Sequence, residues 1–198
     1  MPLSREYTVS LQRAAARTIA AVHARLPLSA VPTAFGRYLD QVYGAARAGA
    51  VALDGQNVFV YCTPPGRPTE ADVAFGVGAT APFDAFGAVE PTPLPIGVVA
   101  TTTHWGRYAE LGAAHEAIVA WCRRHRRRLA GPRWEVYGHW TADDAQLRTD
   151  VFYLLMPTAA SVERLAQAWV PDGGASRPHV MKARSSAWDM DSAEPTSP

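Results

Sequence analysis

One short segment carries the residues best suited to chemistry. Residues 134–140 read WEVYGHW. Alternate side chains of a β-strand point to opposite faces, so Glu135, Tyr137 and His139 share one face. If that face lines a groove, a carboxylate among aromatic rings is partly desolvated and its pKa is expected to rise. Such an acid could pair with a cationic ligand or act as a general acid or base near neutral pH. If the alternation runs the other way, Glu135 is a solvated strand carboxylate.

Four further aromatic residues could form the walls of such a groove. In the strand-like segment VFVYC, Phe59 and Tyr61 share one face. Trp105 and Tyr108 lie at the predicted turn into a helix, near the rim of the groove. Aromatic walls bind flat apolar or cationic ligands by stacking and cation–π contact, at about 0.5–2 kcal/mol each. We predict that these residues bind the ligand together with the acid and the tyrosine of the first segment. Ordinary core packing is the alternative.

Other motifs that could indicate chemistry do not match on closer comparison. Segment 115–119, HEAIV, lacks the second histidine of an H-E-x-x-H zinc site, and the other histidines show no close ligand spacing. Segment 76–81, GVGATA, resembles a dinucleotide-binding loop but continues into PFDAFG instead of a helix. We therefore expect no metal and no cofactor.

The basic segment 122–128, CRRHRRR, invites a nucleic-acid interpretation. It lies in the last turns of a predicted helix, where positive charge offsets the helix dipole. The formal net charge of the chain is only +1. We interpret the segment as a solvated helix end and expect neither a nucleic-acid partner nor a membrane partner.

Periodicity and turn residues predict the elements that must position these side chains. Period-two or continuous apolar segments predict strands, and apolar residues three and four apart predict helices. The predicted order is strand 7–13, strand 18–26, helix 31–49, strands 58–62 and 72–79, strand 95–106, helix 107–129, and strands 133–140 and 147–155.

A shift of 76 residues keeps these elements in phase. It superimposes Val22 on Val98, Phe35 on Leu111, Val42 on Ile118, Ala46 on Cys122, Phe59 on Glu135, Tyr61 on Tyr137 and Phe75 on Val151. We predict an internal duplication of a β-α-β-β unit, at about residues 14–80 and 92–156. Paired units give an α+β fold: a curved antiparallel sheet with two helices on one face and a ligand groove on the other. Chance agreement between two helical stripes is the alternative.

Four segments resemble the GyrI-like effector-binding domain. They are PIGVVATTTHWGRYAEL, IVAWCRRH, WEVYG and TDVFYLL, and the resemblance covers roughly residues 5–156. It implies two β-α-β-β units around a central groove that binds drug-like, often cationic or aromatic, molecules. It also implies a functional acid at Glu135. That domain occurs attached to AraC- and MerR-type regulators as well. Because the sequence shows no helix-turn-helix segment, it resembles the free-standing branch.

Two functions follow from this resemblance. The first is binding of a hydrophobic, aromatic or cationic drug-like molecule, for resistance or detoxification. The second is hydrolysis, because some free-standing relatives open a strained cyclopropane in DNA-alkylating natural products. There Glu135 would orient or deprotonate water, and Tyr137 would donate a hydrogen bond to the departing or carbonyl oxygen. An interaction module for a protein such as a topoisomerase is a third alternative.

Composition limits the class of protein. With 198 residues, 48% hydrophobic and 19% charged, the chain fits a globular protein. It has no signal-peptide pattern and no run of the roughly 20 apolar residues that a spanning helix needs, so we expect a cytoplasmic protein. We predict one domain over residues 1–157, and a short helix with a flexible tail over 158–198. The sequence does not indicate an oligomeric state.

Overall fold

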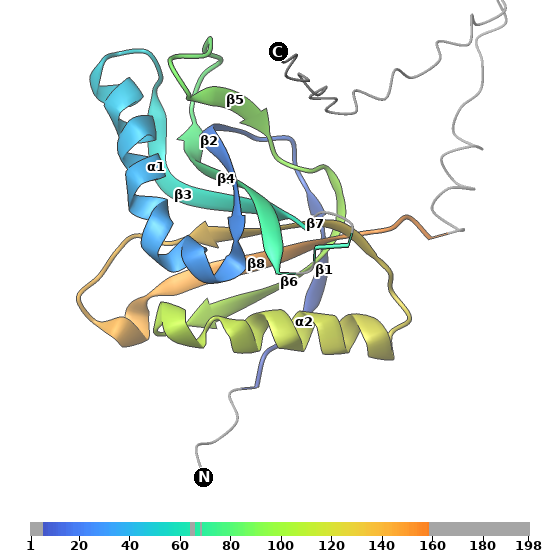
Figure 1. Ribbon diagram of the computed structural model, residues 1–198. Helices are drawn as coiled ribbons and strands as arrows, with labels where there is room; N and C mark the ends of the chain where they lie inside the picture. Colours follow the sequence, from blue (N-terminus) through green and yellow to red (C-terminus); the bar gives the residue numbers. More distant parts are fainter. Residues whose placement is uncertain (1–5, 64–65, 68, 159–198) are drawn as a thin grey trace, which may run out of the picture. The chain divides into compact units, whose positions relative to one another are not determined.

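A computed structural model describes residues 6–63, 66–67 and 69–158. They form one eight-stranded antiparallel sheet with two α-helices (Figure 1). The strands are β1 (Ser10–Ala14), β2 (Thr18–Pro27), β3 (Leu53–Cys62), β4 (Glu70–Ala79), β5 (Glu90–Pro93), β6 (Gly97–Trp105), β7 (Leu129–Tyr137) and β8 (Arg148–Leu155). The helices are α1 (Val31–Arg47) and α2 (Gly112–Arg124), with short 3-10 turns η1 (Leu28–Ala30), η2 (Tyr108–Glu110) and η3 (Asp144–Gln146).

The sheet is built from two β-α-β-β units that meet at its centre. The strand order is β1-β6-β8-β7-β3-β4-β2-β5, so unit one (β2-α1-β3-β4) and unit two (β6-α2-β7-β8) join where β3 pairs with β7. Phe59 is the cross-strand partner of Glu135, the residue 76 positions later, so the two units are arranged symmetrically about this pair. The predicted α+β class, with a curved antiparallel sheet and two helices, is confirmed. A common origin of the two units stays a prediction.

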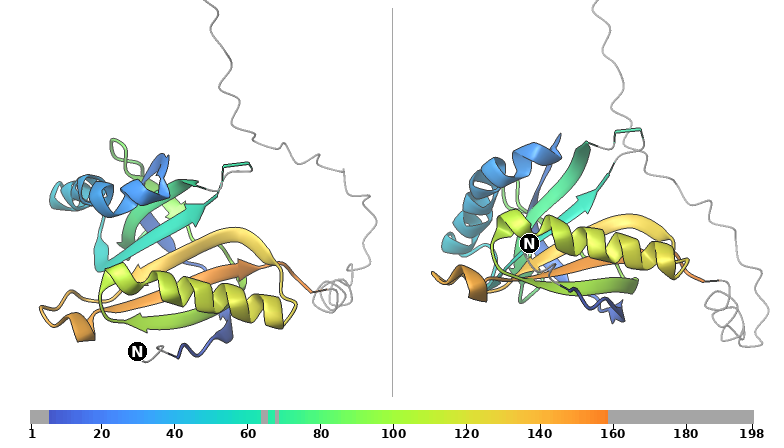
Figure 2. Two further views of the ribbon diagram at one scale, coloured as in Figure 1. Left: turned by 60° about the horizontal axis from the view of Figure 1, so that its bottom comes forward. Right: turned by 90° about the horizontal axis from the view of Figure 1, so that it is seen from below.

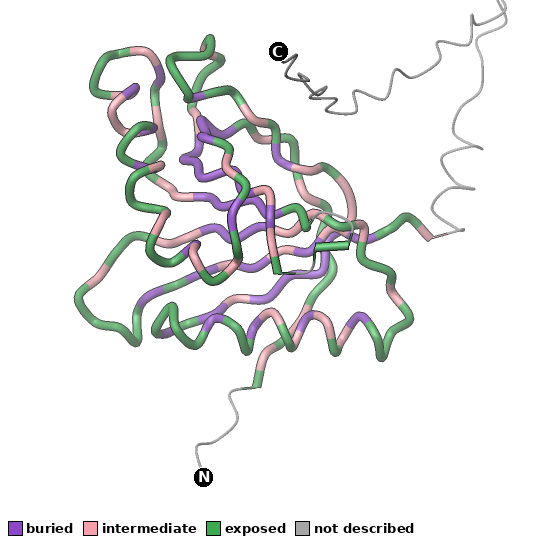
Figure 3. Tube along the Cα trace, viewed as in Figure 1, coloured by how far each residue is buried: buried purple, intermediate pink, exposed green. Residues whose placement is uncertain are grey.

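Local chemistry explains where α1 begins and ends. Pro32 lies in the first turn, where a missing backbone N–H costs no helical hydrogen bond. The chain leaves the helix through Gly49, whose φ of 75° suits glycine. Leu39, Val42 and Ala45 are buried at a three-residue spacing, which places them on one side of the helix. Burial along one side of each helix and through the sheet is visible in Figure 3.

Both helices cover the same face of the sheet. The buried side chains of α1 cluster with Phe75 of β4, and those of α2 cluster with Val151 of β8. Cross-strand partners run from Phe75 through Phe59 and Glu135 to Val151, and such partners share a face. Figure 2 shows α1 beside one half of the sheet and α2 along β6 and β8.

The observed elements differ from the predicted ones mainly at their ends. α2 begins at Gly112 instead of 107, because Tyr108–Glu110 form a 3-10 turn. Strand β5, with the sequence EPTP, was not predicted, because proline is unfavourable in strand interiors. The helix and tail predicted after residue 158 lie outside the described residues. Within the described ranges, each helix is too short or too polar to cross a membrane.

Candidate functional site

A cavity of about 1160 Å³ lies between the two helices and the centre of the sheet. Residues from α1, β3, η2, α2, β7 and β8 line it. The predicted groove on the face opposite the helices is therefore wrong: the cavity is on the helix face. Strand alternation predicts which side chains share a face, but it does not predict which face the helices cover. Trp134 and Val136 are buried in a separate cluster on the other side of the curved sheet.

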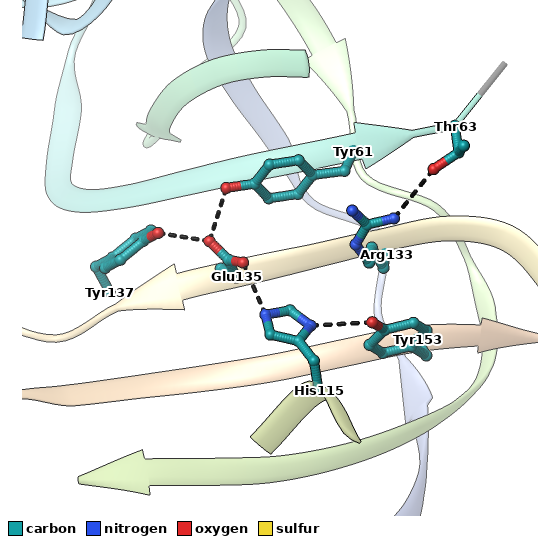
Figure 4. A network of polar contacts seen from close by, with 7 residues as sticks. All are labelled: Tyr61, Thr63, His115, Arg133, Glu135, Tyr137 and Tyr153. Atoms are coloured by element: carbon teal, nitrogen blue, oxygen red, sulfur yellow. Dashed lines mark hydrogen bonds and ion pairs between the residues drawn. The ribbon is translucent and has the colours of Figure 1, made fainter. Parts of the chain in front are cut away.

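Glu135 is the centre of a buried hydrogen-bond network (Figure 4). The Tyr61 hydroxyl donates to Glu135 Oε2 at 2.8 Å, and the Tyr137 hydroxyl donates to the same oxygen at 2.5 Å. His115 Nε2 lies 2.9 Å from Glu135 Oε1. Three donors from β3, β7 and α2 thus hold the carboxylate of Glu135, a residue that is only 6% exposed.

The network continues from His115 to a second tyrosine. His115 Nδ1 lies 3.0 Å from the Tyr153 hydroxyl of β8. Nε2–H can donate to Glu135 whether the imidazole is neutral or charged, and in the neutral form Nδ1 accepts a hydrogen bond from the Tyr153 hydroxyl. A carboxylate, an imidazole and a phenol therefore form one continuous chain, an arrangement that can orient the histidine and pass a proton along it.

The environment changes the pKa of these groups in different directions. Burial raises the pKa of Glu135, but the hydrogen bond and charge of His115 and the two tyrosine hydrogen bonds outweigh it. The pKa of Glu135 is therefore lowered, and the expected rise is wrong. Burial, followed by the charge of Glu135, holds the pKa of Tyr61 and Tyr137 well above the ordinary value, so both remain donors.

Arg133 provides a positive charge beside this network. It is the cross-strand partner of Tyr61 on β3 and of Tyr153 on β8. Its guanidinium carbon lies 5.1 Å from the centre of the Tyr61 ring, and Nη1 donates to the Thr63 hydroxyl at 3.2 Å. A guanidinium held on an aromatic face keeps its remaining N–H groups in a fixed plane.

Aromatic rings form the wall of the cavity on the other side of Glu135. Tyr137 packs against Phe59 with 4.9 Å between ring centres, and against Tyr108 at 5.5 Å. Phe59 also contacts Phe35 of α1 at 5.9 Å. This wall therefore combines side chains from both units.

The structure brings together most of the residues selected from the sequence. Five of the six line the cavity: Phe59, Tyr61, Tyr108, Glu135 and Tyr137. Their roles in binding or catalysis stay predictions.

Trp105, the sixth, is not among the residues that line the cavity. Along β6, Ala100 is the partner of Tyr153, whereas Trp105 is the partner of Arg148 on the opposite face. The Trp105 side chain is 48% exposed and lies under the Arg148 guanidinium, 5.9 Å from its carbon.

Three residues of the site were missed in the sequence. His115 falls in the apolar stripe of α2, where its spacing resembles that of an ordinary buried side chain. Tyr153 and Arg133 share a face with Glu135 by strand alternation, and that signal could have identified both.

No protein-family model matches the chain, and a search of curated proteins found no match. Solved structures are similar. The regulator EcmrR, in a complex with DNA, aligns with a TM-score of 0.65 at 14% identity over 77% of this chain. This chain spans 58% of that protein's length. The isolated EcmrR C-terminal domain aligns with a TM-score of 0.58 at 15% identity, covering 77% of this chain and 99% of the domain.

The chain has the GyrI-like fold. SAV2435, solved bound to tetraphenylphosphonium, aligns with a TM-score of 0.56 at 10% identity, covering 77% of this chain and 94% of SAV2435. A structure described as a hydrolase from Listeria innocua aligns with a TM-score of 0.51 at 10% identity. The alignment covers 75% of this chain and 91% of the hydrolase chain. Proteins with this fold thus include one solved with a bound ligand and one described as an enzyme.

Proposed function

We propose that this protein binds an aromatic, drug-like small molecule in the cavity between α1 and α2, for resistance or detoxification. The observation that carries the proposal is a cavity of about 1160 Å³ with aromatic walls and one buried polar network at its base. Ligand sites are typically concave, largely apolar and supplied with a few convergent polar groups. SAV2435, which has the same fold, was solved bound to tetraphenylphosphonium, and this supports small-molecule binding.

Two helical glycines allow a direct test. Gly112 lines the cavity at the start of α2, and apart from its chain neighbours and the nearby backbone of its own helix no described atom lies within 4 Å of the position of an added Cβ. Gly36 of α1 has the same open space but does not line the cavity. We expect Gly112→Phe to place a ring in the cavity and Gly36→Phe to leave the cavity unchanged.

The measurement is a fluorescence titration with the neutral probe 1-pyrenebutanol. The wild type and Gly36→Phe should bind it with equal affinity. Gly112→Phe should bind about tenfold more weakly, because the added ring obstructs part of the aromatic wall. Equal affinity in all three proteins, or no saturable binding by the wild type, would contradict the proposal.

Hydrolysis of a strained ring is a second candidate, favoured by the chain Tyr153–His115–Glu135. The oxygen of water would bond to one cyclopropane carbon while a water proton passes to the network. The C–C bond breaks, and the carbon that keeps its electron pair would take up a proton from a tyrosine hydroxyl. The product is heavier than the substrate by one water.

Mass spectrometry of a cyclopropane-bearing alkylator incubated with the protein tests this candidate. Turnover that disappears in Glu135→Gln, while binding persists, would establish the enzyme. A ligand of unchanged mass, bound tightly by both proteins, would exclude it for that substrate.

A further inference from the structure

The cavity has few charged groups, and they differ in how many hydrogen-bond partners the protein gives them. Among the described residues that line it, Glu135 is the one carboxylate and Arg133 the one guanidinium. Their hydrogen-bond environments differ. A charge satisfied inside the protein offers little to a ligand, whereas one with unused donors recruits a partner.

Glu135 is already satisfied. Its two oxygens accept from Tyr61, Tyr137 and His115, and its side chain is buried. A cationic ligand would have to displace one of these donors or act across them. Because the donors are themselves packed in the cavity wall, the carboxylate is a poor receptor for a positive charge.

Arg133 is far less satisfied. A guanidinium carries five N–H donors, and within the described residues Arg133 donates one hydrogen bond, to Thr63. None of the described carboxylates lies within ion-pair distance of it. Tyr61 fixes the plane of the guanidinium, which leaves a preorganised edge for the two oxygens of a carboxylate.

The position of Arg133 also indicates the shape of a ligand. Arg133 and Tyr137 lie on the same face of β7, four residues or about 13 Å apart along an extended strand. The ring contacts of Tyr137 with Phe59 and Tyr108 are therefore at one end of the cavity floor and the guanidinium is at the other. A ring system with an acidic group on a short spacer fits both ends.

We infer that the cavity prefers aromatic acids: a carboxylate or similar anion on Arg133, beside the Tyr153 hydroxyl, and the ring system against Phe59, Tyr108 and Tyr137. The inference rests on the proposed function and adds the charge of the ligand. It sets this protein apart from SAV2435, whose solved ligand is the cation tetraphenylphosphonium.

Three probes that differ in one head group test the preference: 1-pyrenebutyrate, 1-pyrenebutylammonium and the neutral 1-pyrenebutanol. In fluorescence titrations at fixed ionic strength, the wild type should bind the butyrate about tenfold or more tightly than the ammonium compound, as a charge-assisted hydrogen bond predicts. Arg133→Gln should weaken butyrate binding by about the same factor and leave butanol binding unchanged.

Arg148→Gln is the matched control, because Arg148 also lies over an aromatic ring, that of Trp105, outside the cavity lining. It should bind all three probes as the wild type does. Unchanged butanol binding also shows that each variant is folded. If the wild type binds butanol but binds the ammonium compound as tightly as the butyrate or more tightly, the charge preference is wrong and the proposed function stands. If none of the probes binds, the proposed function fails and this inference fails with it.

Discussion

The two β-α-β-β units use the same backbone positions for different purposes. In unit two, His115, Glu135 and Tyr153 form the polar chain that lies beneath the cavity. The residues 76 positions earlier in unit one are Leu39, Phe59 and Val77, and all three are buried in one apolar cluster. Unit one therefore has buried apolar side chains at these positions, and unit two has titratable side chains.

The comparison shows how a site can arise on a symmetric scaffold. Unit one supplies tightly packed apolar side chains, which fix β3 and hence the Tyr61 hydroxyl. Unit two has polar groups in place of part of that apolar packing. These groups can be buried only because each has a hydrogen-bond partner. The cavity is lined by residues of both the apolar unit and the polar unit.

Core truncation in unit one should have the largest effect. Leu39→Ala truncates a side chain of α1 that is 7% exposed and packs in the core cluster with Phe75, and should lower the free energy of unfolding by about 2–5 kcal/mol. Urea denaturation measures this loss. Ala113→Gly, at an exposed position in α2, serves as a comparison and should cost no more than about 1 kcal/mol. A Leu39→Ala loss within that range would contradict the tight apolar packing that we assign to unit one.

Copying the unit-one residue into unit two should have the next largest effect. His115→Leu leaves the Glu135 carboxylate without its Nε2 partner and should cost about 2–3 kcal/mol, because an unpaired buried charge is unfavourable.

The double variant His115→Leu/Glu135→Gln separates charge from packing. It removes the charge, while the amide oxygen still accepts from Tyr61 and Tyr137. We expect the double variant to be more stable than His115→Leu alone in the same urea titration. A double variant that is equally or less stable would mean that the loss is one of packing, and the contrast between the units would weaken.

The pH dependence of stability should also distinguish the units. A carboxyl whose folded pKa is lowered contributes stability that is complete above its unfolded pKa and is lost as pH falls through the folded pKa. For Glu135 this loss therefore begins below about pH 4.5, its ordinary value.

Unfolding in urea between pH 3 and 6 measures this contribution. The stability gap between the wild type and Glu135→Gln should narrow as the pH falls below about 4.5, because the protonated acid resembles the amide. Glu116→Gln, at an exposed position on α2, should show no such gap. A gap that widens towards low pH would reverse the sign that we assign to Glu135.

The sequence predicts the local parts of this architecture well. Strand and helix order depend on short-range periodicity, and the pairing of Phe59 with Glu135 agrees with the 76-residue shift. The side of the cavity depends on which sheet face the helices cover, a tertiary choice that alternation does not encode. The pKa direction of Glu135 could not be predicted for a related reason. It depends on His115, which looks like an ordinary member of a helical stripe.

The smallest predicted effects concern the rim of the cavity, where the sequence treats two aromatic residues alike and the structure does not. Tyr108 packs edge-on against Tyr137, so Tyr108→Ala should weaken 1-pyrenebutanol binding by about 0.5–1.5 kcal/mol. Trp105→Ala should change the affinity by less than about 0.5 kcal/mol, because Trp105 lies on the opposite face of β6. Equal losses in both variants would mean that the ligand reaches around the strand end, and that the site extends beyond the cavity.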